Sequence, residues 1–198
     1  PDGYTDFLKP AFKDKLVLTP PHDDDAVLFV YDHMLQKYGD GFLEKLAAQN
    51  PTFVRGTAGP PILTGREGFL GNLTGYPTMA GQPSVGYIPS EDFFITWPQR
   101  WAMFKLTRHK AAARLFLAWV TSYEHQASRG SWSVREDVAP PEGLKPLESY
   151  SNTNPLAFIA WMRDRKRIHE LRMKMQTVFG QVQGQSPLTD PDLLRLYY

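Results

Sequence analysis

The side chains best suited to hold a metal ion lie together in the run His22-Asp23-Asp24-Asp25. Imidazole nitrogens and carboxylate oxygens are common metal ligands in proteins. Side chains of adjacent residues rarely converge on one ion, however, and this run directly precedes the helical pattern AVLFVYDHMLQKY. Acidic residues in that place stabilise the free amides of a helix N-terminus. We therefore expect a helix cap here and no metal site.

The chain lacks the residue patterns of the common catalytic centres. It contains no cysteine, which excludes thiolate catalysis, cysteine metal sites and disulfides. Serine, histidine and aspartate are present, but not in nucleophile-elbow, phosphate-loop, dinucleotide-binding or HExxH patterns. Glu67 and Glu91 could act as paired carboxylates, yet nothing in the sequence fixes their separation. The sequence predicts a non-catalytic protein that needs no cofactor.

Composition indicates a folded protein whose main partner is not nucleic acid. The 198 residues are 42% hydrophobic and 22% charged, which are ordinary globular values. The net charge of +1 offers no electrostatic case for nucleic acid binding. No apolar run reaches the roughly 18 residues needed to span a bilayer, and the first residues, PDGYTDF, do not have the charged and then apolar pattern of a leader. The lack of disulfides leaves the compartment open.

Strand and helix signals alternate through the first half of the chain. Short β-prone runs are bounded by prolines and glycines, and the helical patterns between them end at Gly39 and before Pro51. The expected elements are strands at 16–19 and 52–56, helices at 26–38 and 41–50, a short helix leading to a strand over 64–73, and a loop with a strand over 77–90. The glycines of GTAGPP and GREGFLGN predict turns. This alternation predicts an α/β fold.

The second half opens with an aromatic, β-prone segment and a helix. The run FFITWPQRWAMF predicts a strand over 93–104, although Pro98 favours an edge, a bulge or a crossing between lobes. A helix is expected over 106–126, because its apolar residues recur on one face. These residues are Ala112, Leu115, Phe116, Trp119 and Val120. The pattern predicts a buried amphipathic helix.

A proline-rich connector over 140–155 leads to a long helical pattern with a basic face over 156–180. A solvated helix that covers a lobe explains this pattern, and a helix for a membrane surface or a partner is the alternative. The remaining tail, 181–198, has room for one short helix after Asp190.

Several of these segments, taken in order, resemble a known family. TWPQRWAMFK, AAARLFLAWVTSYEHQ and SVREDV are similar to the C-terminal part of type 2 solute-binding proteins of ABC transporters, the group that binds iron(III), polyamines and related solutes. FLKPAFKDKLVLTPP resembles the start of the family's second lobe, and YGDGFLEKLAAQNPTFV and ILTGREGFL resemble the segments that follow. The resemblance covers roughly residues 5–138. It implies a periplasmic-binding-protein-like type 2 lobe, with a mixed sheet flanked by helices and without the front part of the first lobe.

The resemblance also implies where a ligand would bind. Such proteins close two α/β lobes over a solute, which is held by loop residues at strand ends and at the crossing between lobes. The corresponding residues are Asn72, Thr74, Tyr76, Glu91, Asp92 and Trp97. In polyamine-binding members, carboxylates and indoles near the crossing attract an ammonium group. The alternative is that Glu91 and Asp92 cap a turn and that Trp97 belongs to the core.

Iron(III) does not fit this chain well. Members that bind iron resemble one another in carrying two adjacent tyrosines on the side of the second lobe, and the matching region has only Tyr76. The adjacent pair Tyr197-Tyr198 lies at the end of the tail.

Three segments and two functions follow from the resemblance. Residues 1–95 would form the second-lobe domain, 96–139 the return segment to the first lobe, and 140–198 the connector, basic helix and tail. The first function is capture of a small polar or charged solute, a polyamine, metal or anion, for transport in the periplasm or outside the cell. Its partners would be an ABC permease or a separate N-terminal half. The alternative is a protein-interaction domain or secreted factor that reuses the fold. Its partner would be a second copy or another protein, because a lone return segment exposes apolar surface.

Overall fold

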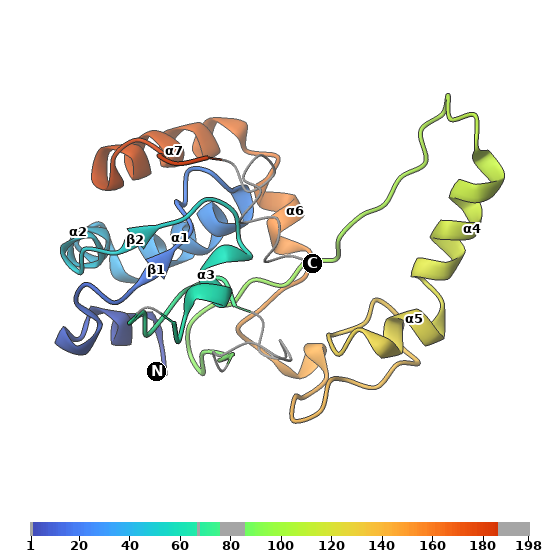
Figure 1. The fold of residues 1–198 in the computed structure, drawn as a ribbon, viewed down its shortest axis with the longest axis horizontal. Helices are drawn as coiled ribbons and strands as arrows, with labels where there is room; N and C mark the ends of the chain where they lie inside the picture. Colours follow the sequence, from blue (N-terminus) through green and yellow to red (C-terminus); the bar gives the residue numbers. More distant parts are fainter. Residues whose placement is uncertain (1, 67, 76–85, 186–198) are drawn as a thin grey trace. The chain divides into compact units, whose positions relative to one another are not determined.

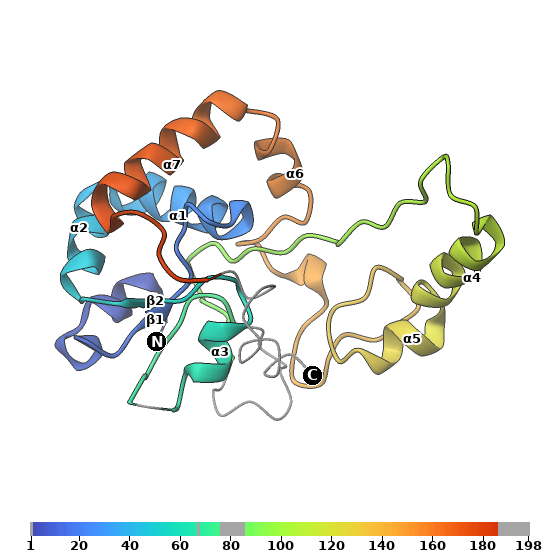
Figure 2. The same ribbon diagram turned by 45° about the horizontal axis from the view of Figure 1, so that its top comes forward.

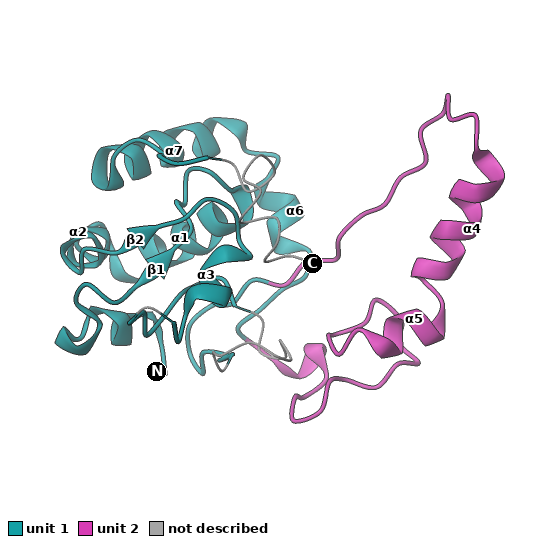
Figure 3. Ribbon diagram, viewed as in Figure 1, with its two compact units in different colours: residues 1–95, 152–198 teal, residues 96–151 magenta. Residues whose placement is uncertain are grey.

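The computed structural model describes residues 2–66, 68–75 and 86–185, which form two units. Unit 1 consists of residues 1–95 and 152–198, and unit 2 of residues 96–151 (Figure 3). Unit 1 contains strands β1 (Val17–Leu18) and β2 (Thr52–Phe53) and most of the helices. Its α-helices are α1 (Asp25–Tyr38), α2 (Gly41–Ala48), α3 (Gly59–Leu63), α6 (Ala157–Trp161) and α7 (Arg165–Phe179), and two 3₁₀ turns, η1 (Tyr4–Leu8) and η2 (Pro10–Phe12), precede them. The predicted α/β class is confirmed.

The sheet of unit 1 is small and parallel. Val17 pairs with Thr52 and Leu18 with Phe53, while Leu16 forms a parallel bridge to Gly71 on the other side. A β-carbon at Gly71 would lie 2.9 Å from the Phe7 ring, so this close approach requires glycine. The expected mixed sheet is wrong for the described residues, which form only parallel pairs.

Helix α1 is the centre of unit 1. Its N-cap, Asp24, accepts hydrogen bonds from the amides of Ala26 (2.8 Å) and Val27 (3.1 Å), as the acidic run predicts. Gly39 ends the helix with φ of 73°, a backbone conformation that favours glycine. Helices α2 and α7 lie alongside α1 in both views (Figures 1 and 2). The apolar faces of these three helices and of β1 form the core.

Helix α7 joins the core through Ile168, Leu171 and Met175, all of which are buried. The single helix expected over 156–180 is wrong in detail, because the structure has two helices, α6 and α7, in its place. Between them, Asp164 accepts a hydrogen bond from the Arg167 amide (3.0 Å) and caps α7. An aspartate inside a helical pattern can act as such a cap.

One further expectation for unit 1 needs correction, and another falls mainly outside the described residues. The helix near residue 64 begins earlier, because Gly59-Pro60-Pro61 forms the first turn of α3 rather than a plain turn. Proline fits the first turn of a helix, where its missing amide would have no partner anyway. The strand expected over 77–90 falls mainly on residues outside the described part of the chain.

Unit 2 contains α4 (Lys110–Val120), α5 (Tyr123–Ser128) and the 3₁₀ turn η3 (Leu147–Ser149). The buried side chain of Gln126 holds it together: its amide donates to the Val120 carbonyl (2.7 Å) and its oxygen accepts from the Ser133 hydroxyl (3.0 Å). Ser122 caps α5 and divides the helix that was expected over 106–126.

The expected burial of that helix is wrong. Of the apolar face of α4 only Val120 is buried, and Leu115 and Trp119 are 73% and 53% exposed. The spacing of apolar residues determines which face of a helix is apolar, but a second layer of structure must exist to cover that face. The strand expected over 93–104 is also wrong, since none of these residues is in a strand.

Candidate functional site

Polar residues of unit 1 lie at the carboxyl ends of the parallel strands, which we call the carboxyl edge of the sheet. Thr19 follows β1, Val54 follows β2, and Asn72 follows Gly71, so all three segments leave the sheet at one edge. The Thr19 hydroxyl donates to the Gly56 carbonyl (2.8 Å) and ties two of the segments together. Open α/β sheets bind ligands outside the carboxyl ends of their strands.

Asn72 orients the third segment of this edge. Its amide donates to the Thr64 hydroxyl (2.7 Å), and its oxygen accepts from the Thr74 backbone amide (2.9 Å). Thr64 in turn donates to the Pro60 carbonyl in α3 (2.8 Å). Sequence analysis missed Thr64, whose role depends on the folding of GPP as a helix start.

Thr74 has a hydroxyl that the rest of the described chain leaves without a partner. Its Oγ1 is buried and makes no hydrogen bond to any described residue. Buried polar atoms are nearly always hydrogen-bonded, so each exception needs an explanation. A hydroxyl can donate one hydrogen bond and accept two. Thr74 Oγ1 therefore has hydrogen-bonding capacity at the carboxyl edge that the described residues leave unused.

Asp92, in contrast, is occupied by the protein's own donors. Its buried carboxylate accepts hydrogen bonds from the Tyr4 amide (2.6 Å), the Lys37 ammonium (2.5 Å) and the Tyr38 hydroxyl (2.5 Å). Burial alone raises the pKa of Asp92, but the hydrogen bonds from Lys37 and Tyr38 outweigh burial and bring the pKa below its ordinary value. Asp92 therefore joins η1 to α1, a structural role that differs from the turn cap expected as the alternative.

Of the other expected site residues, Glu91 and Trp97 are described and Tyr76 is not. The Glu91 side chain is exposed, and only its backbone carbonyl receives a bond, from Lys37 (3.3 Å). Trp97 belongs to unit 2, whereas Asn72, Thr74 and Asp92 belong to unit 1. Tyr76 lies outside the described residues, as do Glu67 and the pair Tyr197-Tyr198.

The acidic run before α1 is engaged within the protein. Asp23 forms a two-pronged pair with Arg55 (2.8 and 2.9 Å), Asp24 caps the helix, and Asp25 pairs with Arg172 (2.5 Å). Within 2–66, 68–75 and 86–185 no group of three or more histidine, aspartate or glutamate residues is placed to hold a metal ion. The same ranges contain no helix long and apolar enough to cross a membrane.

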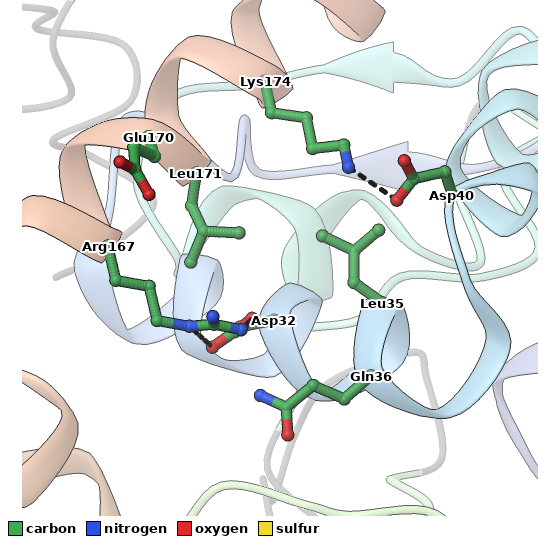
Figure 4. Close-up of a pocket in the computed structure, with 8 residues that line it drawn as sticks. All are labelled: Asp32, Leu35, Gln36, Asp40, Arg167, Glu170, Leu171 and Lys174. Carbon is green, nitrogen blue, oxygen red and sulfur yellow. Dashed lines mark hydrogen bonds and ion pairs between the residues drawn. The ribbon is translucent and has the colours of Figure 1, made fainter.

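A pocket of about 310 Å³ lies between α1 and α7 (Figure 4). Asp32 is buried there and accepts from Trp161 Nε1 (2.8 Å) and from Arg167 Nε and Nη2 (2.9 and 2.5 Å). Lys174 of α7 pairs with Asp40, which follows α1 (2.5 Å; Figure 4). These charged side chains form ion pairs with one another and leave no free charge for a ligand. We therefore interpret the pocket as part of the packing interface between α1 and α7.

Comparisons with known proteins leave the family open. No protein-family model matches the chain, and no curated protein matches it. The resemblance to type 2 solute-binding proteins therefore stays a prediction, and the carboxyl edge around Asn72 and Thr74 is the candidate site that the geometry supports.

Proposed function

We propose that this chain captures a small polar solute reversibly and without catalysis, at the carboxyl edge of the sheet in unit 1. The observation that carries this proposal is the buried Thr74 hydroxyl, which has no described partner and is held in place by Asn72. A site that lacks only a hydrogen-bonding ligand leaves such an atom unsatisfied in the free protein.

The solute that best suits this edge is neutral. The charged side chains that follow the strands neutralise each other: Asp23, after β1, pairs with Arg55, after β2. An ammonium or a carboxylate ligand would need an uncompensated partner, because a charge loses its hydration on binding. Hydroxyl or amide groups need only donors and acceptors such as Thr74 Oγ1 and Asn72.

The wider setting follows from the sequence resemblance. We infer a lobe of a type 2 solute-binding protein, working in the periplasm or outside the cell with an ABC permease and a first lobe supplied by other polypeptide. The helices of unit 1 around a parallel β-pair agree with this setting at the level of fold class.

The Thr74→Val substitution tests the proposal. Valine removes the unsatisfied hydroxyl at nearly constant volume, so the free energy of unfolding of the free chain should rise by about 1 kcal/mol. Binding of a neutral solute should weaken about tenfold. Thermal unfolding with glucose, xylitol and trehalose, compared with spermidine and phosphate, measures both effects.

Thr64→Val is the matched control. The Thr64 hydroxyl has two partners, so its loss should destabilise the chain rather than stabilise it. A Thr74 variant that is also destabilised would show that the hydroxyl has a structural role. A transition that none of the solutes raises would count against solute capture at this edge.

A second function, protein interaction, is favoured by the exposed apolar surface of unit 2. Trp101 and Trp119 are 60% and 53% exposed, and Leu115 lies on the same helix as Trp119. Large exposed apolar patches mark interaction sites in folded proteins.

A further inference from the structure

Aromatic rings form a continuous row across unit 2. The centroids of Trp101 and Phe116 are 5.1 Å apart, those of Phe116 and Trp119 are 5.8 Å apart, and those of Trp119 and His125 are 4.1 Å apart. We call these four residues the aromatic row. It links the extended segment before α4 with α4 and α5 (magenta in Figure 3). Phe104 and Leu106, between the segment and α4, are 86% and 90% exposed.

The extended segment beside this row has an unpaired backbone. The peptide groups of residues 99–103 make no backbone hydrogen bond to any residue in the described part of the chain, and the next bond along the chain runs from the Thr107 amide to the Phe104 carbonyl. Aromatic residues in this run favour a strand. A strand needs a neighbour, and an unpaired edge is a template for one. The predicted strand is missing here because the described residues supply no neighbour.

The same region is strongly basic. Its cations are Arg100, Lys105, Arg108, Lys110 and Arg114, and the sequence has no aspartate or glutamate between Asp92 and Glu124. None of these five forms an ion pair among the residues that the structure describes. A partner with carboxylates at its rim would complement this charge.

We propose that residues 99–103 and the aromatic row bind an extended segment of another polypeptide as an added β-strand. The added strand satisfies the free peptide groups of residues 99–103, places apolar side chains against Trp101, Phe116 and Trp119, and sets acidic residues opposite Arg100 and Arg114. This inference rests on the second proposed function, protein interaction, and names its partner and its mode. It does not depend on solute capture at Thr74.

Two other occupants fit the surface less well. A bilayer of anionic lipid would accept the aromatic side chains and the cations, but its hydrocarbon core cannot hydrogen-bond to the backbone of residues 99–103. A second copy of this chain, pairing through the same segment, would bring Arg100 and Lys105 against the same cations. A polypeptide strand with acidic residues satisfies both the backbone and the charge.

Selection from a library of random 12-residue peptides displayed on phage, with the full chain as the target, tests the proposal. The selected peptides should alternate β-branched or aromatic residues with aspartate or glutamate. A synthetic copy of the best peptide should bind at least tenfold more weakly to the Arg100→Glu/Arg114→Glu variant. Hydrogen exchange of the amides of residues 99–103 should slow at least tenfold in the complex.

The Lys45→Glu/Arg66→Glu variant changes net charge equally on exposed residues of unit 1 and should bind the peptide as tightly as the unmodified chain. Circular dichroism checks that both variants are folded, and the exchange measurement on the unmodified chain needs no variant. The proposal is overturned if no acidic peptide is enriched, or if protection is confined to α4. Amides of residues 99–103 that are already protected in the free chain, or binding to phosphatidylserine vesicles without any selected peptide, would also overturn it. Each of these results leaves the Thr74 assay unaffected.

Discussion

Two buried aspartates join parts of unit 1 that are far apart in the sequence. Asp92 accepts from Tyr4, which is 88 positions away, and Asp32 accepts from Arg167, which is 135 positions away. Removing one partner of a buried, hydrogen-bonded charge leaves the other partners unsatisfied, and this is costlier than the pair is worth. The two carboxylates should therefore be important for stability.

Asp92→Ala should lower the free energy of unfolding by about 2–3 kcal/mol, with the lower figure favoured because the Lys37 side chain is partly solvated. Its neighbour provides the control: Glu91 is exposed and contributes only its backbone carbonyl, which Glu91→Ala retains. Urea unfolding of both variants measures the difference. Equal unfolding midpoints for the two would refute the structural role of Asp92.

The same carboxylates predict sensitivity to acid. Burial raises the pKa of Asp32, but hydrogen bonds from Arg167 and Trp161 outweigh burial and lower the pKa in the folded chain, as happens at Asp92. A lowered folded pKa gives stability that is fully present above the unfolded value of about 3.9 and lost as pH falls through the folded pKa. The urea midpoint should therefore fall steeply below about pH 4. Asp32→Asn, which cannot ionise, should flatten this fall, and an unchanged slope would contradict the assignment.

At the scale of elements, α7 should contribute much of the stability of unit 1. Met175 is fully buried among core residues, whereas Met173 on the same helix is half exposed. Met175→Ala should lower the free energy of unfolding by about 2–4 kcal/mol, because it leaves a cavity in the core. Met173→Ala should change it by less than about 0.5 kcal/mol. Thermal unfolding distinguishes the two, and similar effects would mean that α7 does not pack as described.

Local sequence signals predict those elements whose start, end and apolar face are all encoded within one short stretch of sequence. Helix α1 has its cap, Asp24, its stop, Gly39, and an apolar face within one short stretch, and its bounds follow closely from the sequence. The segment over 93–104 has β-prone residues but no strand to pair with, so it stays extended. The apolar face of α4 is predicted correctly as a face, but its exposure depends on what else covers it.

The same distinction explains the candidate site. Asn72 and Thr74 could be proposed from their place after a predicted strand, and the structure gives them a mutual contact. The hydrogen bond from the Tyr4 amide to Asp92 could not be predicted, because no short-range pattern links residues so far apart in the sequence. The pairing of Asp32 with Arg167 and Trp161 was missed for the same reason.

For the molecule as a whole, the two units should be separable. Unit 2 leaves and rejoins unit 1 at neighbouring points: the Phe94 amide donates to the Asn152 carbonyl (3.2 Å), and the Thr153 hydroxyl donates to the Phe94 carbonyl (2.7 Å). A Gly/Ser linker of about six residues in place of 96–151 can join these points without strain. The shortened chain should keep the helical signal of unit 1 and unfold cooperatively.

Circular dichroism during heating measures this outcome. The shortened chain with Met175→Ala should unfold at a lower temperature, which shows that the transition reports on the core of unit 1. Melting without a cooperative transition would show that unit 1 needs unit 2 in order to fold.

The contact of α1 with α7 also determines when this protein can fold during its synthesis. Asp32 emerges from the ribosome 135 residues before Arg167. At translation rates of about 5–20 residues per second, the apolar stripe of α1 waits on the order of 10 s for the helix that covers it. During that interval the nascent chain is a substrate for chaperones, and mutations that slow the closing of the core would be expected to reduce yield in the cell before they reduce stability in the test tube.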